Sequence, residues 1–336
     1  MNKIALITVF FGETPDYFRL YLESLKNNLD IDFYIIGSIK KTKSSKNVHF
    51  VNMSFDEFID KANTTLKLKL SYENPYKTCD LKPAFGKIFH SITSNYDYWG
   101  HTDIDLYFGS LKEMISEISK NNPDIYTPGV RSTGHLQVYK SNNIFLKKLL
   151  KTAQYNILIH SKNNHILDEF FIDYFALKYK EKLKWSILDI DDIKLHLTSF
   201  KGGATNFPDN ERIKCVNLSE KLTFTNTKNI TKSILYYHWM GQKKTIDWNS
   251  INSKIIIENE KSIQKNQHYI FKFIYILCQK YQLKALIKII FKLIDKSNIL
   301  IILFKKRPHL LQRFILIYNC LHLTSYYTSF ILPPKK

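Results

Sequence analysis

The segment YDYWGHTDIDLYFG, residues 96–109, joins an aromatic, β-forming run to two carboxylates, Asp103 and Asp105. Alternate residues of an extended chain project to the same face, so both carboxylates can point the same way where the strand ends. Paired carboxylates in such a place can hold a hard divalent cation against a phosphate-bearing ligand. The segment therefore predicts a strand followed by a candidate ligand site.

The Asp-Ile-Asp pattern occurs three times, and its surroundings separate the copies. The copy at 30–32 precedes a short strand, and we expect a solvated turn there. The copy at 189–191 suits an edge strand or a helix cap. Only the copy at 103–105 follows a helix and a strong β-forming run and precedes another helix, which is where open α/β sheets bind ligands.

The remaining pattern alternates strands and helices, which predicts an α/β fold with a mostly parallel sheet covered by helices. Ser54 and Glu57 form a capping-box pattern at one helix start. Residues 226–230 look like a linker. The expected strands are 3–11, 33–37, 48–53, 96–102, 125–126, 135–139 and 234–239, and the expected helices are 16–27, 55–63, 81–94 and about 168–179.

Length and composition indicate one large domain with an appendage, since the chain has 336 residues and is 44% hydrophobic. The four cysteines show no metal-finger spacing, which suits free thiols in a reducing compartment. The apolar run at residues 4–11 is short and lacks a small-residue cleavage site, so we expect a buried strand rather than a signal peptide.

The net charge of +19 is concentrated late in the chain, because residues 251–336 hold 15 Lys and Arg against 3 Asp and Glu. There, lysines recur mostly every four residues among aliphatic and aromatic residues, at Lys272, Lys280, Lys284, Lys288, Lys292 and Lys296. This pattern predicts a basic, apolar helical region that binds an anionic membrane surface. A helical cap packed on the domain is the alternative. The run at 314–332 contains polar residues and is a poor membrane span.

Nucleic acid is not an expected partner, because only five residues are Arg and the basic residues lie among aliphatic ones.

Four further motifs accompany Asp103 and Asp105 in order: KTCDLKPAFG at 77–86, STGHLQVY at 132–139, LDEF at 167–170 and YYHWMGQKK at 236–244. Over roughly residues 1–250 this set resembles the metal-dependent GT-A glycosyltransferases, in particular bacterial DxD enzymes that build capsule, O-antigen or lipooligosaccharide. The resemblance implies a GT-A fold at 1–250, followed by the helical region at 251–336.

The resemblance implies roles at the first two motifs. Asp80 would bind hydroxyls of the donor sugar, and Lys82 would lie beside the donor. Asp103 and Asp105 would hold Mn²⁺ or Mg²⁺ against the nucleotide diphosphate. Asp80 and Lys82 also suit an ordinary capped helix start.

Two later motifs would lie near the sugar. His135 would contact the sugar or the acceptor, although a satisfied core histidine is equally compatible. Asp168 and Glu169 would open a helix below the anomeric carbon, as in members that retain anomeric configuration. Acidic residues also favour any helix N-terminus through the helix dipole.

In the last motif, His238 would complete the metal shell, Gly241 would let the backbone approach the phosphates, and Lys244 would neutralise the leaving diphosphate. The Pro-Trp that follows this lysine in the family is absent, so Lys243 remains an alternative to Lys244. The nucleotide base would lie at the end of the first strand, at Phe10 and Gly12.

The expected activity is metal-dependent transfer of a hexose from a nucleotide sugar, a UDP-sugar in the first instance, to a cell-surface polysaccharide or lipid-linked glycan. We expect the protein in the cytoplasm, peripheral on the inner face of the bacterial inner membrane. The alternatives are a non-catalytic, membrane-associated assembly factor of polysaccharide synthesis and a basic nucleic-acid-binding protein.

Overall fold

The computed structural model describes residues 2–40, 42–128, 132–165, 167–172, 175, 185–187, 196–200, 203–205, 213–219, 221–226, 229–239, 243, 246–251 and 253–256. The third Asp-Ile-Asp copy, Gly241, Lys244 and the basic region from residue 257 onward lie outside this part of the chain.

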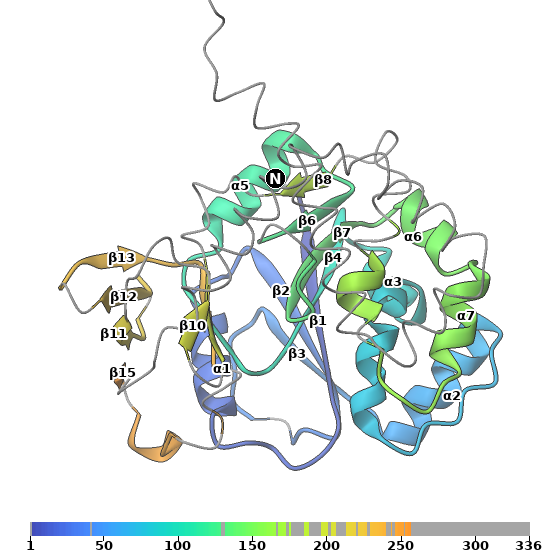
Figure 1. The fold of residues 1–336 in the computed structure, drawn as a ribbon, viewed down its shortest axis with the longest axis horizontal. Coiled ribbons are helices and arrows are strands. Elements are labelled where there is room, and N and C mark those ends of the chain that lie inside the picture. The colour runs from blue at the N-terminus through green and yellow to red at the C-terminus, as the bar shows by residue number, and fades with distance from the viewer. Residues whose placement is uncertain are drawn as a thin grey trace, which may run out of the picture.

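A seven-stranded sheet forms the centre of the described part of the molecule (Figure 1). Its order is β3 (Val48–Asn52), β2 (Ile31–Gly37), β1 (Ile4–Phe10), β4 (Tyr98–Thr102), β7 (Leu136–Lys140), β6 (Ile125–Thr127) and β8 (Trp185–Ile187). Neighbouring strands are parallel except where β7 pairs with β4 and with β6. The predicted α/β fold with a mostly parallel sheet is confirmed.

Helices cover both faces of this sheet (Figure 1). On one side lie α1 (Phe18–Leu25) and α5 (Lys112–Asn121). On the other lie α2 (Phe55–Leu66), α3 (Phe85–Ile88), α4 (His90–Thr93), α6 (Ile144–Leu149) and α7 (Ala153–Ile159). Side chains of β1 point alternately to the two faces of the sheet. Ile4 and Leu6 pack in the hydrophobic core on the α1 side, and Ile7 packs in the core on the α2 side.

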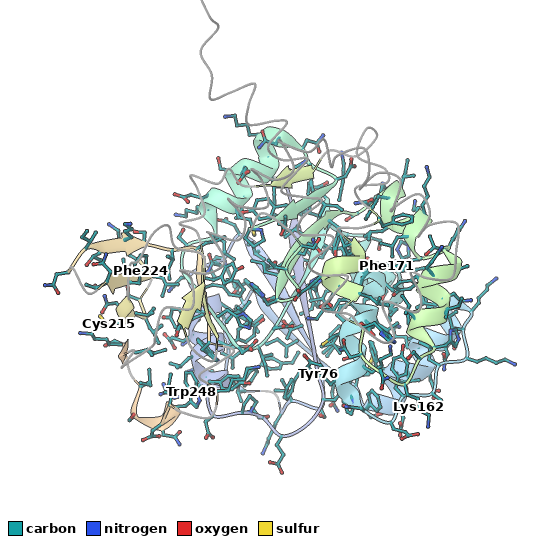
Figure 2. The ribbon with its side chains drawn as sticks, in the orientation of Figure 1. Tyr76, Lys162, Phe171, Cys215, Phe224 and Trp248 are labelled. Carbon is teal, nitrogen blue, oxygen red and sulfur yellow. The ribbon has the colours of Figure 1, made fainter. Side chains whose placement is uncertain are left out.

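Two smaller sheets extend the α1 side. One contains β10 (Gly203–Thr205), β9 (His196–Phe200), β14 (Tyr236–His238) and β5 (Leu106–Phe108). The other contains β13 (Thr231–Ser233), β12 (Thr223–Asn226), β11 (Ile213–Asn217) and β15 (Lys254–Ile256), and Figure 2 shows Phe224 within it. The pairing of β15 with β11 brings residues 254–256 into this sheet.

Three of the expected segments differ in the structure. The helix expected at 81–94 is a 3₁₀ helix, η1 (Pro75–Ala84), followed by the short α3 and α4. Pro83 has no amide hydrogen to donate to an α-helical ladder, and Gly86 lies against the Trp99 ring, where an added Cβ would be 2.2 Å from a ring carbon.

The linker expected at 226–230 connects β12 and β13, which pair with each other as antiparallel strands of one sheet. Asn226 accepts a hydrogen bond from the Ile230 amide at 2.8 Å, and Asn229 has a left-handed φ of 60°. Asparagine suits such turns because its short amide side chain can bond to nearby backbone.

The expected turn at 30–32 is also revised, since Asp32 lies within β2. Its carboxylate bonds to His49 at 2.9 Å and to the Tyr96 hydroxyl at 2.8 Å. This aspartate is therefore structural, as expected, but it belongs to the sheet.

Within the described residues, no helix is long and apolar enough to cross a bilayer.

Candidate active site

The candidate site forms where the parallel strands β1 and β4 end, at the carboxyl edge of the sheet. Asp103 follows β4, and the half-buried Phe10 ends β1 beside it, since Ile7 and His101 are register partners. Gly12 has a φ of +130°, which L-residues rarely adopt, and its amide donates to Ser38 Oγ at 3.4 Å. The edge thus carries a carboxylate and a tight glycine turn on adjacent strands.

Lys82 is the electrostatic centre of one half of the site. Its ammonium lies 2.8 Å from Asp103 Oδ1 and 3.1 Å from Asp168 Oδ2, and it donates to the Gly134 carbonyl at 2.5 Å. Three partners match the three N–H groups of an ammonium. Burial opposes the charged form, but the neighbouring Asp103 and the other anions outweigh it and hold the pKa of Lys82 well above its usual range.

Asp168 and Glu169 lie at the start of the short π-helix η2 (Leu167–Phe171), and Asp168 contacts this lysine. Burial raises the pKa of Asp168 to about 8, against the lowering effect of Lys82. Glu169 accepts a hydrogen bond from the Gly134 amide at 3.2 Å. A Cβ at residue 134 would stand 2.7 Å from Asp168 Oδ2 and 2.8 Å from Glu169 Oε1, so an alanine there would require both carboxylates to shift.

The second half of the site surrounds Asp105. Strand β14 pairs with β5 so that His238 lies opposite Leu106, which brings the last motif beside the strand-end carboxylates. His238 Nε2 lies 3.1 Å from Asp105 Oδ2, and Lys243 Nζ lies 2.5 Å from the same oxygen. Burial favours the neutral acid, but His238 and Lys243 prevail and hold the pKa of Asp105 far below its usual range.

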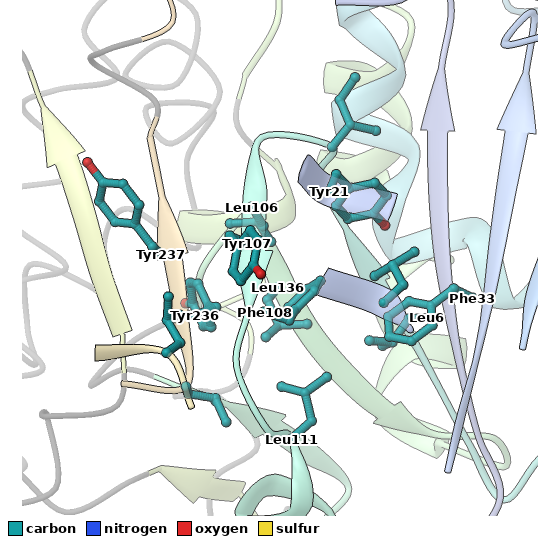
Figure 3. Close-up of a cluster of buried hydrophobic side chains, with 14 of the residues drawn as sticks. Leu6, Tyr21, Phe33, Leu106, Tyr107, Phe108, Leu111, Leu136, Tyr236 and Tyr237 are labelled. Carbon is teal, nitrogen blue, oxygen red and sulfur yellow. The ribbon is translucent and has the colours of Figure 1, made fainter. Parts of the chain in front are cut away.

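His135 packs against His238 in this half of the site. Its ring lies on that of His238, with centroids 4.3 Å apart, and its Nε2 is 2.8 Å from the Tyr236 hydroxyl. Tyr236 is fully buried and packs against Phe108, and Figure 3 shows both rings in the cluster between β5 and β14. His135 thus links the sheet core to His238.

Asp80 lies apart from the open part of the site. It is fully buried, and its carboxylate accepts hydrogen bonds from Lys77 at 2.6 Å and from the backbone amides of His165 and Leu167 at 2.9 Å each. In this structure it presents no surface to a donor sugar.

Of the three expected metal ligands, the structure brings two into contact with each other. Within the described residues, no group of three or more His, Cys, Asp and Glu side chains is arranged to hold a metal ion. Asp105 and His238 are in contact, while Asp103 pairs with Lys82. The Nδ1 of His238 is buried and has no hydrogen-bond partner in the described part of the chain. One carboxylate and one imidazole suit Mn²⁺ or Mg²⁺ as protein ligands if oxygens of a bound ligand supply further positions.

Two lysines form ion pairs with aspartates of the motifs, although the resemblance assigns neither of them a definite role. Lys243, left open against Lys244, makes the contact to Asp105, whereas Gly241 and Lys244 lie outside the described residues. Lys77, three residues before Asp80, pairs with it in the buried layer. An i, i+3 pairing in a 3₁₀ helix could have indicated the second contact.

The fold and the site define a mixed α/β protein with a lysine and carboxylate centre at the carboxyl edge of a mostly parallel sheet. By sequence, the chain belongs to the family of unknown function DUF6625, whose model matches residues 6–269. No curated protein matches it.

Two solved structures are similar in part. Mouse xyloside xylosyltransferase 1, in its apo form, has a TM-score of 0.38 and 9% identity, over 59% of this chain and 88% of that one. The apo structure of the bifunctional glycosyltransferase WbbM has a TM-score of 0.35 and 10% identity, over 60% of this chain and 40% of that one. Neither score is high enough to define a shared fold.

Proposed function

We propose that this protein is a glycosyltransferase that moves a hexose from a nucleoside-diphosphate sugar, a UDP-sugar in the first instance, to a glycan acceptor. The observation that carries the proposal is the convergence of His238 and Lys243 on Asp105, more than 130 residues away in the chain, beside the Lys82, Asp103 and Asp168 cluster. The order of the five motifs along the chain supports the same class of enzyme.

Charge development in the reaction fits the two halves of the site. Breaking a sugar–phosphate bond leaves a diphosphate oxyanion and an oxocarbenium-like sugar. Lys243 supplies positive charge at the Asp105 half for the diphosphate. Glu169 lies at the other half beside Asp168, where a carboxylate can stabilise the sugar cation, and transfer with retention is the stereochemistry we propose.

Asp105 and His238 are the residues that would hold Mn²⁺ or Mg²⁺, and Asp103 would complete the set if it exchanged Lys82 for the ion. Such an ion supplies Lewis-acid stabilisation of the departing diphosphate. Lys82 then keeps its contacts to Asp168 and Gly134 and holds the sugar-side carboxylates in place. We propose that the nucleotide base binds at Phe10, which ends β1, and at Gly12, two residues further on.

The acceptor we propose is a cell-surface polysaccharide or lipid-linked glycan, reached on the cytoplasmic face of the inner membrane of a bacterium. The proposal rests on the basic, apolar pattern of residues 268–296, which lies outside the described residues.

Binding is tested by thermal unfolding of the full chain with a panel of UDP- and GDP-sugars, with and without Mn²⁺. A donor that binds the native state raises the melting temperature by mass action. Lys243→Ala should weaken this shift more than Lys244→Ala, because Lys243 makes the Asp105 contact. A shift without any turnover would favour the non-catalytic assembly factor, and no shift with any nucleotide sugar would contradict the proposal.

A further inference from the structure

The 3₁₀ helix η1 divides its side chains between two neighbours. Residues three apart in such a helix lie above one another. Lys82 faces Asp103 and Asp168, whereas Lys77 and Asp80 face the chain between residues 158 and 167. One rigid element therefore contacts both the site and the segment that leads into η2.

Lys77 and Asp80 form a buried charge pair, with side chains 2% and 0% exposed. Lys77 Nζ donates to Asp80 Oδ2 at 2.6 Å and to the carbonyls of Asn163 at 2.6 Å and Leu158 at 3.1 Å. Burying two charges is tolerated only with such complete pairing, and the loss of one partner leaves an uncompensated charge. The pair thus fastens η1 to the end of α7 and to the loop after it.

Asp80 continues this attachment into η2. Its Oδ1 accepts the Leu167 amide at 2.9 Å, and its Oδ2 accepts the His165 amide at 2.9 Å. Leu167 immediately precedes Asp168. Two further contacts connect η1 to the same region, since Tyr155 donates to the Asp80 carbonyl at 3.1 Å and Asn164 donates to the Tyr76 carbonyl at 3.2 Å.

We propose that Lys77 and Asp80 are positioning residues that hold Asp168 and Glu169 at their working distance from Lys82. Asp80 accepts a hydrogen bond from the backbone amide just before Asp168. Lys82, two residues further along η1, forms an ion pair with the Asp168 side chain. Gly134 lies directly against this carboxylate, since a Cβ at that residue would be 2.7 Å from Asp168 Oδ2. The catalytic consequence rests on the proposed function, but the placement of η2 does not.

The test compares the full-length wild type with Asp80→Asn and with the double variant Lys77→Met/Asp80→Asn. The double variant removes both charges and leaves neither uncompensated, so it guards against simple misfolding. Asn28→Ala is the matched control. Asn28 is a buried polar side chain that joins two other loops, through the Gly109 carbonyl at 2.9 Å and the Leu111 amide at 2.8 Å.

Two readouts are measured: hydrogen exchange of peptides covering residues 159–171, and kcat and KM for nucleotide release from the UDP-sugar that the wild type turns over fastest. We expect faster exchange in both Asp80 variants. We also expect a fall in kcat of at least about tenfold with KM for the donor within about twofold, because misplacing a catalytic group costs rate more than ground-state binding. Asn28→Ala should lower the melting temperature and leave kcat within about twofold.

Unchanged exchange at 159–171 would overturn the positioning role whatever the activity. An unchanged kcat despite faster exchange, or an equal fall in kcat in Asn28→Ala, would also overturn it. Absence of nucleotide release by the wild type counts against the proposed function, and the exchange result then stands alone as the test of positioning.

Discussion

Lys82 shares one positive charge between two carboxylates that differ in their access to water. Asp103 is 35% exposed, so water and Lys82 together can stabilise its charge. Asp168 is 5% exposed and lies farther from the ammonium, at 3.1 Å. A single ammonium cannot fully compensate both, and the buried carboxylate carries the desolvation penalty. This asymmetry is why burial raises the pKa of Asp168 to about 8.

Asp168 should make the protein less stable as pH rises from about 4 to about 8. Its folded-state pKa is raised, so in this window the folded state holds a proton that the unfolded state has released. Its contribution to stability is fully present below about pH 4 and is lost as the pH rises through about 8. In denaturant unfolding, the stability difference between wild type and Asp168→Asn should change by at most about 1.4 kcal/mol per pH unit.

The exposed Asp30 serves as a control, and Asp30→Asn should track the wild type across this range. A stability difference between wild type and Asp168→Asn that does not vary with pH would contradict the raised pKa.

Gly134→Ala tests the close approach of Gly134 to Asp168 and Glu169. The added methyl group would overlap both Asp168 and Glu169, and overpacking of this kind costs roughly 1–3 kcal/mol. We expect a lower melting temperature and a loss of nucleotide release larger than the fraction unfolded explains. Normal stability with normal release would show that these carboxylates are free to move.

At the scale of elements, the sequence predicts contacts between neighbouring residues but not contacts between distant segments. The capping box is confirmed, with Glu57 N bonded to Ser54 Oγ at 3.2 Å and Ser54 N to Glu57 Oε2 at 2.7 Å, because it needs only four consecutive residues. The 3₁₀ form of η1 was not predicted. The buried pair Lys77 and Asp80 takes its partners from residues 158–167, some 80 positions away, and no local pattern encodes them.

Ser54→Ala should destabilise the protein by about 1 kcal/mol through loss of the cap of α2. Donor binding should be unchanged, since this helix start is not part of the site. The free energy of unfolding by denaturant and the donor-induced melting shift are the two measurements. A reduced donor shift at unchanged stability would mean that α2 belongs to the site after all.

At the scale of the whole molecule, the sequence shows the order of the motifs along the chain but does not show which of them are in contact. The alternation of strands and helices predicted the sheet, and with it the shared edge that carries Asp103 and Phe10. The pairing of β14 with β5, which sets His238 against Asp105, joins segments 130 residues apart and depends on the complete fold. Asp80 was expected at the donor, but its buried side chain contacts Lys77 and the backbone amides of His165 and Leu167.

The basic region predicts salt-sensitive membrane binding of the full chain. Each surface lysine contributes roughly 1 kcal/mol toward an anionic bilayer, and salt screens this attraction. Sedimentation with phosphatidylserine-containing vesicles should exceed that with phosphatidylcholine alone and should weaken as salt rises. Equal sedimentation with both vesicles at every salt concentration would favour the alternative in which the region caps the domain.

Nucleotide release from a panel of UDP- and GDP-sugars, measured with Mn²⁺ and a glycan acceptor, tests glycosyl transfer most directly. The wild type should release UDP, EDTA should suppress the release, and Asp105→Asn and His238→Ala should each lower it by at least about tenfold while remaining folded. Release by the wild type that persists undiminished in EDTA and in both variants, or no release from any donor of the panel, would contradict the account.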